Sequence, residues 1–503
     1  MRLPTAGLPL VLVLAASACS ESSRSGWQDK VGTDVFAALE RSPRVRVVVA
    51  LRPPTPASLS PEARQRKIGQ RRQEVLRSVS PANVQPRSLW SSLSGFAGEV
   101  TPAGLEELSV LDEVLRIDLD VAGGGHLAES RPLVGADLVW QSGLIGAGTT
   151  IAVLDTGIDT DHADLQGALV AEHCFCDRGD GSGCCPNGQL AQDGPGSAED
   201  DNGHGTNVAG IALSDGNVGL VGLAPGAALV GIKVLDNGSR FAFASQVISG
   251  LDWILTNHPE VGVVNMSLGT DLAFAGDCDG AAAWTLLWAQ AIDTLWQRGV
   301  SVIASTGNQG DPTRMQAPAC GQHTLSVGAV YDGNLGSVNL LGCSDVTTQA
   351  DQVTCFSNAS GSLDLLAPGA LIQASGRGGG TSVYAGTSQA APHVAGAVAV
   401  LREVDPTLSP EQIEILLKSS GALVLDVRNN TSYPRLNLAA AVSAAGAEVC
   451  ADGRDNDGDT LVDCADPDCT GAVICQPEIC ADGAANNADA LVDCDDTDCT
   501  DAL

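Results

Sequence analysis

An apolar run that ends on an aspartate, TIAVLDTGID, occupies residues 150–159. Residues 150–154 carry no charge and include β-branched side chains, which favours a strand that is buried on both faces. In parallel α/β sheets, ligands bind beyond the carboxyl ends of the strands. Asp155 stands at that end, so we interpret it as a candidate active-site carboxylate, although a lone Asp at a strand end is usually a turn residue.

Strand and helix patterns alternate outward from this run, from about residue 131 to residue 445. Further apolar strands are predicted at Leu229–Val234, Gly262–Met266, Val300–Ser305, Thr324–Val330 and Leu363–Leu366. Helices are predicted at Gly205–Leu213, Ala244–Thr256, Ala281–Arg298 and Ser388–Val404, with one more from the capping box at Ser409 to Gly421. This alternation predicts an α/β fold of three layers, in which helices cover both faces of a parallel sheet.

Two further polar motifs stand at predicted helix starts. NGHGT occupies residues 202–206, and GTSQAAPHVAG occupies residues 386–396. A serine at a helix start has free backbone N–H groups nearby, and these can stabilise an oxyanion. Taken singly, His204 and Ser388 would be interpreted as caps or satisfied polar groups. Taken with Asp155 in this order and context, they indicate nucleophilic catalysis.

These three motifs make residues 131–445 similar to the subtilisin-like serine proteases, whose catalytic order is Asp, His, Ser. The resemblance implies that Ser388 is the nucleophile, that His204 is its general base and that Asp155 orients the histidine. It implies that Asn308 donates to the oxyanion. It also implies two segments that pair with the substrate and flank the pocket for the residue before the scissile bond: Ser267-Leu268-Gly269 and Ser305-Thr306-Gly307.

Four positions depart from the pattern of that family. Asn207 replaces a usual histidine that is not the catalytic one, and Ser305-Thr306 replaces two usual alanines. Gln389 follows the nucleophile where methionine is usual. Because glutamine cannot be oxidised to a sulfoxide, the sequence predicts unusual tolerance to peroxide.

Residues 44–120 predict a small α+β domain. Strand and helix patterns follow in the order β-α-β-β-α-β, which is typical of a ferredoxin-like fold. The segment GFAGEVTPAGLEELSVLDEVLRIDLD (95–120) also resembles the inhibitor propeptide of subtilisin-like proteases. The linker at residues 121–130 is rich in glycine, which makes it a natural cleavage site.

The N-terminus has the pattern of an export signal. Arg2 precedes an apolar run at residues 7–18, which is too short to span a bilayer. Cys19 follows Ala16-Ser17-Ala18 and resembles the acylated cysteine of bacterial lipoproteins, so we expect either lipidation at Cys19 or plain secretion. If Cys19 is lipidated, the lipid is attached to the propeptide, and maturation would release the protease from the membrane.

Net charge and cysteine content limit the partners and the compartment. The formal net charge is −33, which argues against binding to nucleic acid. Sixteen cysteines in an exported chain indicate disulfides, whose pairing the sequence does not give. Cys174, Cys176, Cys184 and Cys185 lie on one Gly/Asp-rich insertion, for which we expect disulfides, with a zinc site that includes His173 as the alternative.

Residues 446–503 form an acidic tail with an internal repeat. Glu448, Cys450, Asp452, Asp463, Cys464, Asp468 and Cys469 recur thirty residues later, and the second copy stops before its fourth cysteine. Oxygen ligands at alternate positions suit calcium, so the first copy is either a calcium site or a solvated acidic loop. The candidate calcium ligands are Asp455, Asp457, Asp459 and Asp463.

The combined prediction is an exported serine endopeptidase, made as a zymogen that processes itself. Its expected parts are a signal peptide (1–18), an inhibitor-like propeptide with linker (19–125), a peptidase domain (126–445) and a repeat tail (446–503). The expected partners are protein or peptide substrates and its own propeptide, with no cofactor for the chemistry, and the enzyme is expected to be a monomer outside the cell. Two alternatives remain: an inactive adhesion protein that uses calcium, and an esterase with the same triad.

Overall fold

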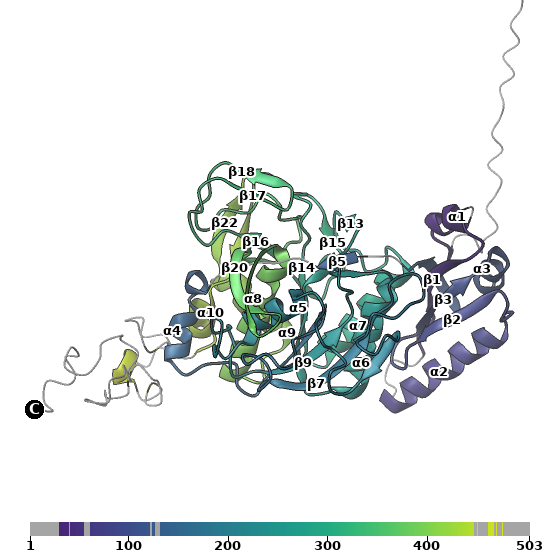
Figure 1. Ribbon diagram of the computed structural model, residues 1–503, viewed down its shortest axis with the longest axis horizontal. Coiled ribbons are helices and arrows are strands. Elements are labelled where there is room, and N and C mark those ends of the chain that lie inside the picture. Colours follow the sequence, from purple (N-terminus) through teal and green to yellow (C-terminus); the bar gives the residue numbers. More distant parts are fainter. Residues whose placement is uncertain are drawn as a thin grey trace, which may run out of the picture.

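The computed structural model describes residues 30–446, apart from residues 40, 55–60, 121–122 and 126–130, together with residues 450, 461–466, 469 and 475. Its centre is a ten-stranded sheet (Figure 1). From one edge to the other, the strands are β22 (Ala422–Asp426), β23 (Thr431–Arg435), β19 (Leu365–Pro368), β16 (Thr324–Val330), β14 (Ser301–Ser305), β11 (Val261–Met266), β6 (Thr150–Asp155), β9 (Ala228–Lys233), β7 (Leu169–Phe175) and β8 (Ala191–Asp193).

Helices cover both faces of this sheet, as the apolar strands require. Alternate residues of β6 point to opposite faces, so Ile151 belongs to one core and Ala152 to the other. The first core is completed by α4 (Ala136–Gln141), α5 (His204–Leu213), α8 (Thr387–Val404), α9 (Pro410–Ser420) and α10 (Leu438–Ala444). The second core is completed by α6 (Ala244–Asn257) and α7 (Ala283–Gln297). The predicted α/β fold with a mostly parallel sheet is confirmed.

Strands that the sequence analysis missed lie mainly at the edges of the sheet and in hairpins. The sheet is parallel from β23 to β7, whereas β22 and β8 pair antiparallel to their neighbours. The alternation in β7 is hidden because it mixes buried and half-buried residues. Short pairs complete the region: β20 (Ala370–Gly376) with β21 (Gly380–Ala385), β13 (Ala273–Phe274) with β15 (Met315–Gln316), and β17 (Val338–Leu340) with β18 (Cys343–Asp345).

Residues 30–120 form a separate small domain, here called the N-terminal domain. After α1 (Thr33–Leu39), its elements follow in the order β1 (Val45–Leu51), α2 (Pro61–Arg77), β2 (Val84–Leu89), β3 (Gly95–Val100), α3 (Pro102–Ser109) and β4 (Val114–Leu119). The four strands form an antiparallel sheet in the order β2-β3-β1-β4. Figure 1 shows this sheet lying against the face of the large domain that carries α6 and α7.

Disulfides join the cysteines of the described region in local pairs. In the large domain they join Cys174 to Cys185, Cys176 to Cys184, Cys278 to Cys320 and Cys343 to Cys355. The first two pairs confirm the disulfide interpretation of the insertion and overturn the zinc alternative, since bonded sulfurs are no longer thiolate ligands. In the first tail repeat, Cys450 is joined to Cys469 and Cys464 to Cys475.

Several sequence predictions lie outside the described residues. These are the signal peptide, Cys19, the second tail repeat and three of the four candidate calcium ligands, Asp455, Asp457 and Asp459. Asp463 is described and begins a short 3-10 helix. Among the described helices, none combines the length and the apolar character needed to cross a membrane.

Candidate active site

Asp155 and His204 meet at the carboxyl edge of the central sheet. Asp155 is the last residue of β6, and His204 is the first residue of α5. His204 Nδ1 lies 2.5 Å from Asp155 Oδ1, which also accepts a hydrogen bond from the Thr156 backbone N–H. Burial raises the pKa of the Asp155 carboxyl above its ordinary value, and the neighbouring His204 opposes that rise. This contact fixes the orientation of the His204 ring.

A second aspartate, Asp200, holds the loop that carries His204. Its carboxylate accepts hydrogen bonds from the backbone N–H of Gly203 and from the Thr156 and Thr206 hydroxyls. These bonds tie the end of β6 to the start of α5. The sequence analysis missed Asp200, and the only available signal was its place two residues before NGHGT.

Ser388 lies at the second position of α8. Its Oγ donates to the backbone oxygen of Ser267 at 3.0 Å. Pro392 cannot donate to the Ser388 carbonyl, as its spacing in the sequence predicts, because proline has no N–H. The Ser267 hydroxyl donates to that carbonyl instead, at 2.5 Å. Ser388 is therefore fixed by the strand end that the sequence analysis assigned to the substrate cleft.

Asn308 follows β14 and is oriented by the residue before Ser388. The backbone N–H and the hydroxyl of Thr387 both donate to Asn308 Oδ1, at 2.8 and 3.0 Å. Asn308 Nδ2 is buried and has no hydrogen-bond partner among the described residues. A buried amide donor without a partner is what an oxyanion hole offers to its ligand. The orienting role of Thr387 was missed, because it requires contact between residues far apart in the chain.

A short strand from the linker occupies the groove beside Ser388. This strand, β5 (Gly123–Gly125), lies between β10 (Arg240–Phe241) and β12 (Leu268–Thr270) and is antiparallel to both. Gly125 is opposite Leu268, and Gly123 is opposite Thr270. The chain direction of β5 therefore leads toward Ser267 and Ser388. The segment Leu268-Gly269 does pair with an extended backbone, and the backbone that it binds here is that of the same chain.

Two departures from the family pattern, Asn207 and Gln389, form one hydrogen-bonded unit. Gln389 Nε2 donates to Asn207 Oδ1 at 3.1 Å, and Asn207 Nδ2 donates to the Ser382 hydroxyl at 3.1 Å. Both side chains are completely buried. The residue that follows Ser388 is thus linked through Asn207 to β21.

Activity of the parent is expected to survive dilute hydrogen peroxide that inactivates a Gln389→Met variant. The two methionines of the described region, Met266 and Met315, are at most 1% exposed, so no accessible thioether lies beside Ser388. Gln389→Leu is the matched control, because it also removes the bond to Asn207 but carries no sulfur. Residual activity after timed peroxide treatment measures the effect. Equal loss in the parent and in Gln389→Met would contradict the prediction.

The N-terminal domain supplies carboxylates to the starts of α6 and α7. The N-cap residues of these helices, Phe243 and Ala282, have no side chain that can accept a hydrogen bond. Asp120 accepts the Ser245 backbone N–H at 2.7 Å, and Asp118 accepts the backbone N–H of Ala283. Carboxylates at helix N-termini satisfy free N–H groups and interact favourably with the helix dipole.

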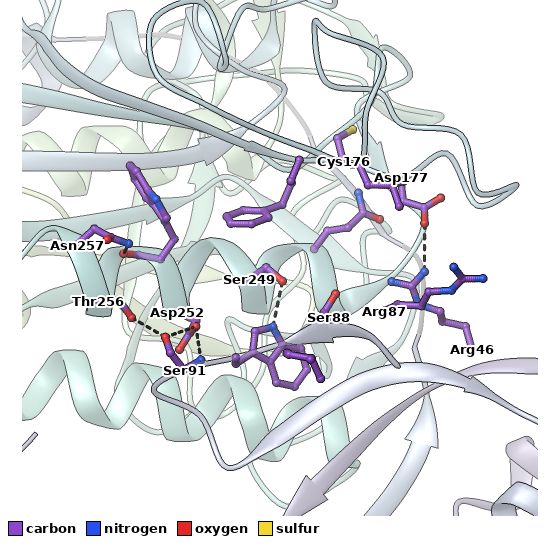
Figure 2. A pocket seen from close by; sticks show the side chains of 17 residues that line it. Arg46, Arg87, Ser88, Ser91, Cys176, Asp177, Ser249, Asp252, Thr256 and Asn257 are labelled. Carbon is purple, nitrogen blue, oxygen red and sulfur yellow. Dashed lines mark hydrogen bonds and ion pairs between the residues drawn. The ribbon is translucent and has the colours of Figure 1, made fainter. Parts of the chain in front are cut away.

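The reverse arrangement occurs along β2, where a carboxylate of α6 faces the N-terminal domain. Asp252 accepts the backbone N–H groups of Ser91 and Ser92, at 2.9 and 2.7 Å. Trp90 Nε1 donates to Ser249 at 3.0 Å. Figure 2 shows Ser91 turned toward Asp252 and Thr256 beside a cavity of about 350 Å³ between the two domains. These hydrogen bonds surround a shared apolar cluster, because buried side chains of the N-terminal domain pack in one core with those of α6 and α7.

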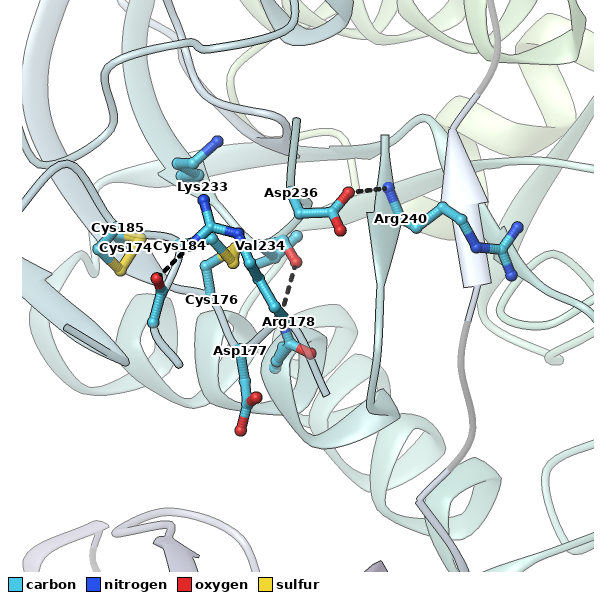
Figure 3. Close-up of a disulfide and its surroundings, with 12 residues drawn as sticks. Cys174, Cys176, Asp177, Arg178, Cys184, Cys185, Lys233, Val234, Asp236 and Arg240 are labelled. Carbon is cyan, nitrogen blue, oxygen red and sulfur yellow. Dashed lines mark hydrogen bonds between the residues drawn. A yellow bond between two sulfur atoms is a disulfide. The ribbon is translucent and has the colours of Figure 1, made fainter. Parts of the chain in front are cut away.

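The disulfide-bonded insertion also contacts the N-terminal domain. Its two disulfides lie side by side near the end of β9 (Figure 3). Asp177, next to Cys176, forms an ion pair with Arg46 at 3.1 Å, and Arg46 also pairs with Asp120 at 3.2 Å. Arg46 further packs on the Phe243 ring, 4.1 Å from its centroid. The insertion therefore adds a specific contact between the domains.

Metal ligands do not gather around these residues. Within the described part of the chain, no group of three or more His, Cys, Asp or Glu side chains is placed to hold a metal ion. The residues at hand are instead a hydrogen-bonded Asp–His pair, a serine hydroxyl at a helix start and an unpartnered amide donor. Such a set is typical of sites for acyl transfer.

Comparison with known proteins agrees with the fold and identifies a family. A model of the subtilase family matches residues 146–445. The chain is 29% identical over 409 residues to alkaline serine exoprotease A of Vibrio alginolyticus, a match that covers 77% of this chain and 66% of the exoprotease. It is 33% identical over 289 residues to subtilisin of Bacillus pumilus, covering 57% of this chain and 88% of that protein. The structure of fervidolysin from Fervidobacterium pennivorans has the same fold, with a TM-score of 0.58 at 20% identity, covering 79% of this chain and 61% of that chain.

Proposed function

Because the chain belongs to the subtilase family of serine endopeptidases, we propose that it hydrolyses peptide bonds through an acyl-enzyme on Ser388. The observation that supports this proposal is the placement of these groups beyond three neighbouring strands. The Asp155–His204 pair lies at the end of β6, Ser388 is bonded to Ser267 beyond β11, and Asn308 follows β14. A serine hydroxyl beside an unpartnered amide donor, together with a histidine held by a buried carboxylate, is the arrangement that amide hydrolysis needs.

The mechanism assigns one task to each group. Ser388 Oγ attacks the scissile carbonyl carbon while His204 takes its proton, and the new oxyanion accepts a hydrogen bond from Asn308 Nδ2. The C–N bond then breaks, and His204 passes the proton to the departing amine. Water, activated by His204, releases the acid from Ser388. Asp155 holds the imidazole tautomer and stabilises its charged form.

The substrate is a protein or peptide that binds as an added strand. The pairing of β5 with β12 supports this mode, since main-chain hydrogen bonds to Leu268 and Thr270 depend little on side chains. We expect the pocket beyond this strand to lie between Ser267-Leu268-Gly269 and Ser305-Thr306-Gly307, as the resemblance to the family implies. The side chain before the scissile bond enters between these segments.

The N-terminal domain acts as the propeptide of a zymogen. Its linker fills the substrate groove at β5, and its carboxylates cap α6 and α7. The linker enters the groove as a substrate does, and the rest of the N-terminal domain is held by Arg46, Trp90 and Asp120. It therefore inhibits the peptidase by occupying its substrate site. Cleavage in the linker, after Gly125, would separate the two domains covalently.

Release of the cleaved propeptide is expected to be slower near pH 4.5 than at neutral pH. Burial raises the pKa of Asp120 from 3.8 to about 6, although Arg46 opposes the rise. Burial also raises the pKa values of Asp118 and Asp252. A group with a raised pKa in the complex favours the complex at low pH, and this contribution is lost as the pH rises through about 4 to 6.

The test incubates the newly cleaved enzyme at each pH and assays samples after transfer to a common neutral buffer. Asp120→Asn cannot ionise, and its release should therefore depend less on pH. Faster release at pH 4.5 in the parent would contradict the prediction.

Export and membrane attachment complete the proposal. An apolar signal at residues 1–18 would direct the chain out of the cytoplasm, and lipid on Cys19 would anchor only the precursor. The disulfides of the large domain support an oxidising compartment. Maturation would then release a soluble, monomeric protease whose acidic tail is either a calcium site or a solvated acidic loop.

The test of endopeptidase activity compares amide and ester substrates with the same acyl group. The mature chain is expected to cleave both, and a fluorophosphonate that labels the serine in equimolar amount is expected to stop both. Cleavage of the ester alone would indicate an esterase. If the fluorophosphonate does not label the chain and neither substrate is cleaved, the result would favour the inactive adhesion protein.

A further inference from the structure

The side chain of Gln316 lies between the two segments that flank the pocket for the residue before the scissile bond. Gln316 belongs to β15, and its backbone N–H donates to the Thr306 carbonyl at 2.9 Å. The next residue, Ala317, accepts the Thr270 N–H at 3.0 Å. This stretch is therefore tied to both walls of the pocket.

Gln316 fills space that side chains at two glycines would otherwise take. A Cβ atom added to Gly269 would lie 2.7 Å from Gln316 Oε1, and one added to Gly307 would lie 2.5 Å from it. Real Cβ atoms do not approach oxygen so closely, and Gly307 also has φ of 104°, which favours glycine. The Oε1 atom thus lies against the backbone of both segments. Glycines at these positions would leave a deep pocket, but the Gln316 side chain makes it shallower.

The amide oxygen of Gln316 is buried and has no hydrogen-bond partner among the described residues. The side chain is 3% exposed, and Oε1 is buried. A buried acceptor without a donor is unfavourable, and a ligand that supplies the donor relieves this cost. A site built in this way discriminates against analogues that lack the donor.

We propose that Gln316 sets the substrate preference, selecting a medium-sized side chain with an N–H donor, such as Asn or Gln, before the scissile bond. This inference rests on the proposed peptidase function. The amide N–H of such a side chain would donate to Gln316 Oε1, which lies against Gly269 and Gly307. Large aromatic side chains are disfavoured because Gln316 occupies their volume.

The test uses peptides that differ only in the residue before the scissile bond. Asn is compared with Leu, and Gln with Met, because each pair has nearly the same shape. In the parent, kcat/KM should be about 10- to 100-fold higher for the Asn and Gln peptides than for the Leu and Met peptides, respectively. Gln316→Leu keeps the volume and should abolish that ratio. Gln316→Gly opens the pocket and should raise kcat/KM for Phe about 10-fold or more.

Each variant is first titrated with the fluorophosphonate, which separates the two proposals. If the parent is not labelled and cleaves no peptide, the peptidase function itself is wrong. If the parent is fully labelled but cleaves Leu and Met peptides as well as Asn and Gln peptides, only the role of Gln316 is wrong. An unchanged ratio in a labelled Gln316→Leu variant would also overturn it.

Discussion

Replacing Ser388 by alanine is expected to lower kcat for amide hydrolysis about 10⁶-fold. The linker between the N-terminal domain and the large domain is then expected to remain uncleaved. Alanine removes the only atom that can form the acyl bond, and the linker strand β5 then remains in the groove as an uncut ligand. Intact mass and N-terminal sequencing measure the processing, and fluorophosphonate labelling measures the nucleophile. The parent should show a new N-terminus within or just beyond the linker at residues 121–130.

Two controls separate loss of chemistry from loss of structure. Ser344→Ala removes an exposed hydroxyl on β18 and should be processed and labelled like the parent. Mature parent enzyme added to the Ser388→Ala precursor should cut it at the same linker, since that substrate site is intact. Self-processing or normal labelling of Ser388→Ala would exclude Ser388 as the nucleophile.

The elements that carry the active site could be predicted because their patterns are local. The β6 strand is buried along its whole length, so every residue from Thr150 to Leu154 contributes to one signal. The same holds for α8, whose start, proline and small residues all lie within one segment. Asp155, His204 and Ser388 could be placed because each one ends or begins such an element.

The groups that orient these residues could not be predicted, because they act across the chain. Thr387 and Asn308 are 79 residues apart, and Asp200 and Thr156 are 44 apart. Gln316 carries no local signal that its amide faces Gly269 and Gly307. A single sequence reports which residues repeat along an element, but hydrogen bonds between loops depend on the packing of the whole sheet.

The interface between the domains illustrates the same limit. The β-α-β-β-α-β pattern and the glycine-rich linker were visible in the sequence. The capping of α6 by Asp120 was not, since the N-cap residue of α6 is Phe243, which cannot accept a hydrogen bond and does not indicate where the cap comes from. An uncapped predicted helix start is therefore a useful sign that another segment of the chain packs there.

Replacing Asn308 by leucine is expected to lower kcat about 10²- to 10³-fold and to leave KM nearly unchanged. Leucine has a similar shape but cannot donate, so the developing oxyanion loses a partner. The ground state loses little, because Asn308 Nδ2 has no partner within the described chain before the reaction begins. Peptide hydrolysis under saturating substrate measures kcat, and labelling by the fluorophosphonate should slow as well.

The leucine variant also removes the acceptor for Thr387, so a second variant is needed. Thr387→Val keeps Asn308 but removes one of the two donors that orient it, the hydroxyl at 3.0 Å. Its backbone N–H still holds Oδ1, and we expect a smaller loss of kcat than in Asn308→Leu. If Asn308→Leu loses no more activity than Thr387→Val, the contribution of Asn308 is to hold the loop. If it loses far more with KM unchanged, the amide donates to the transition state.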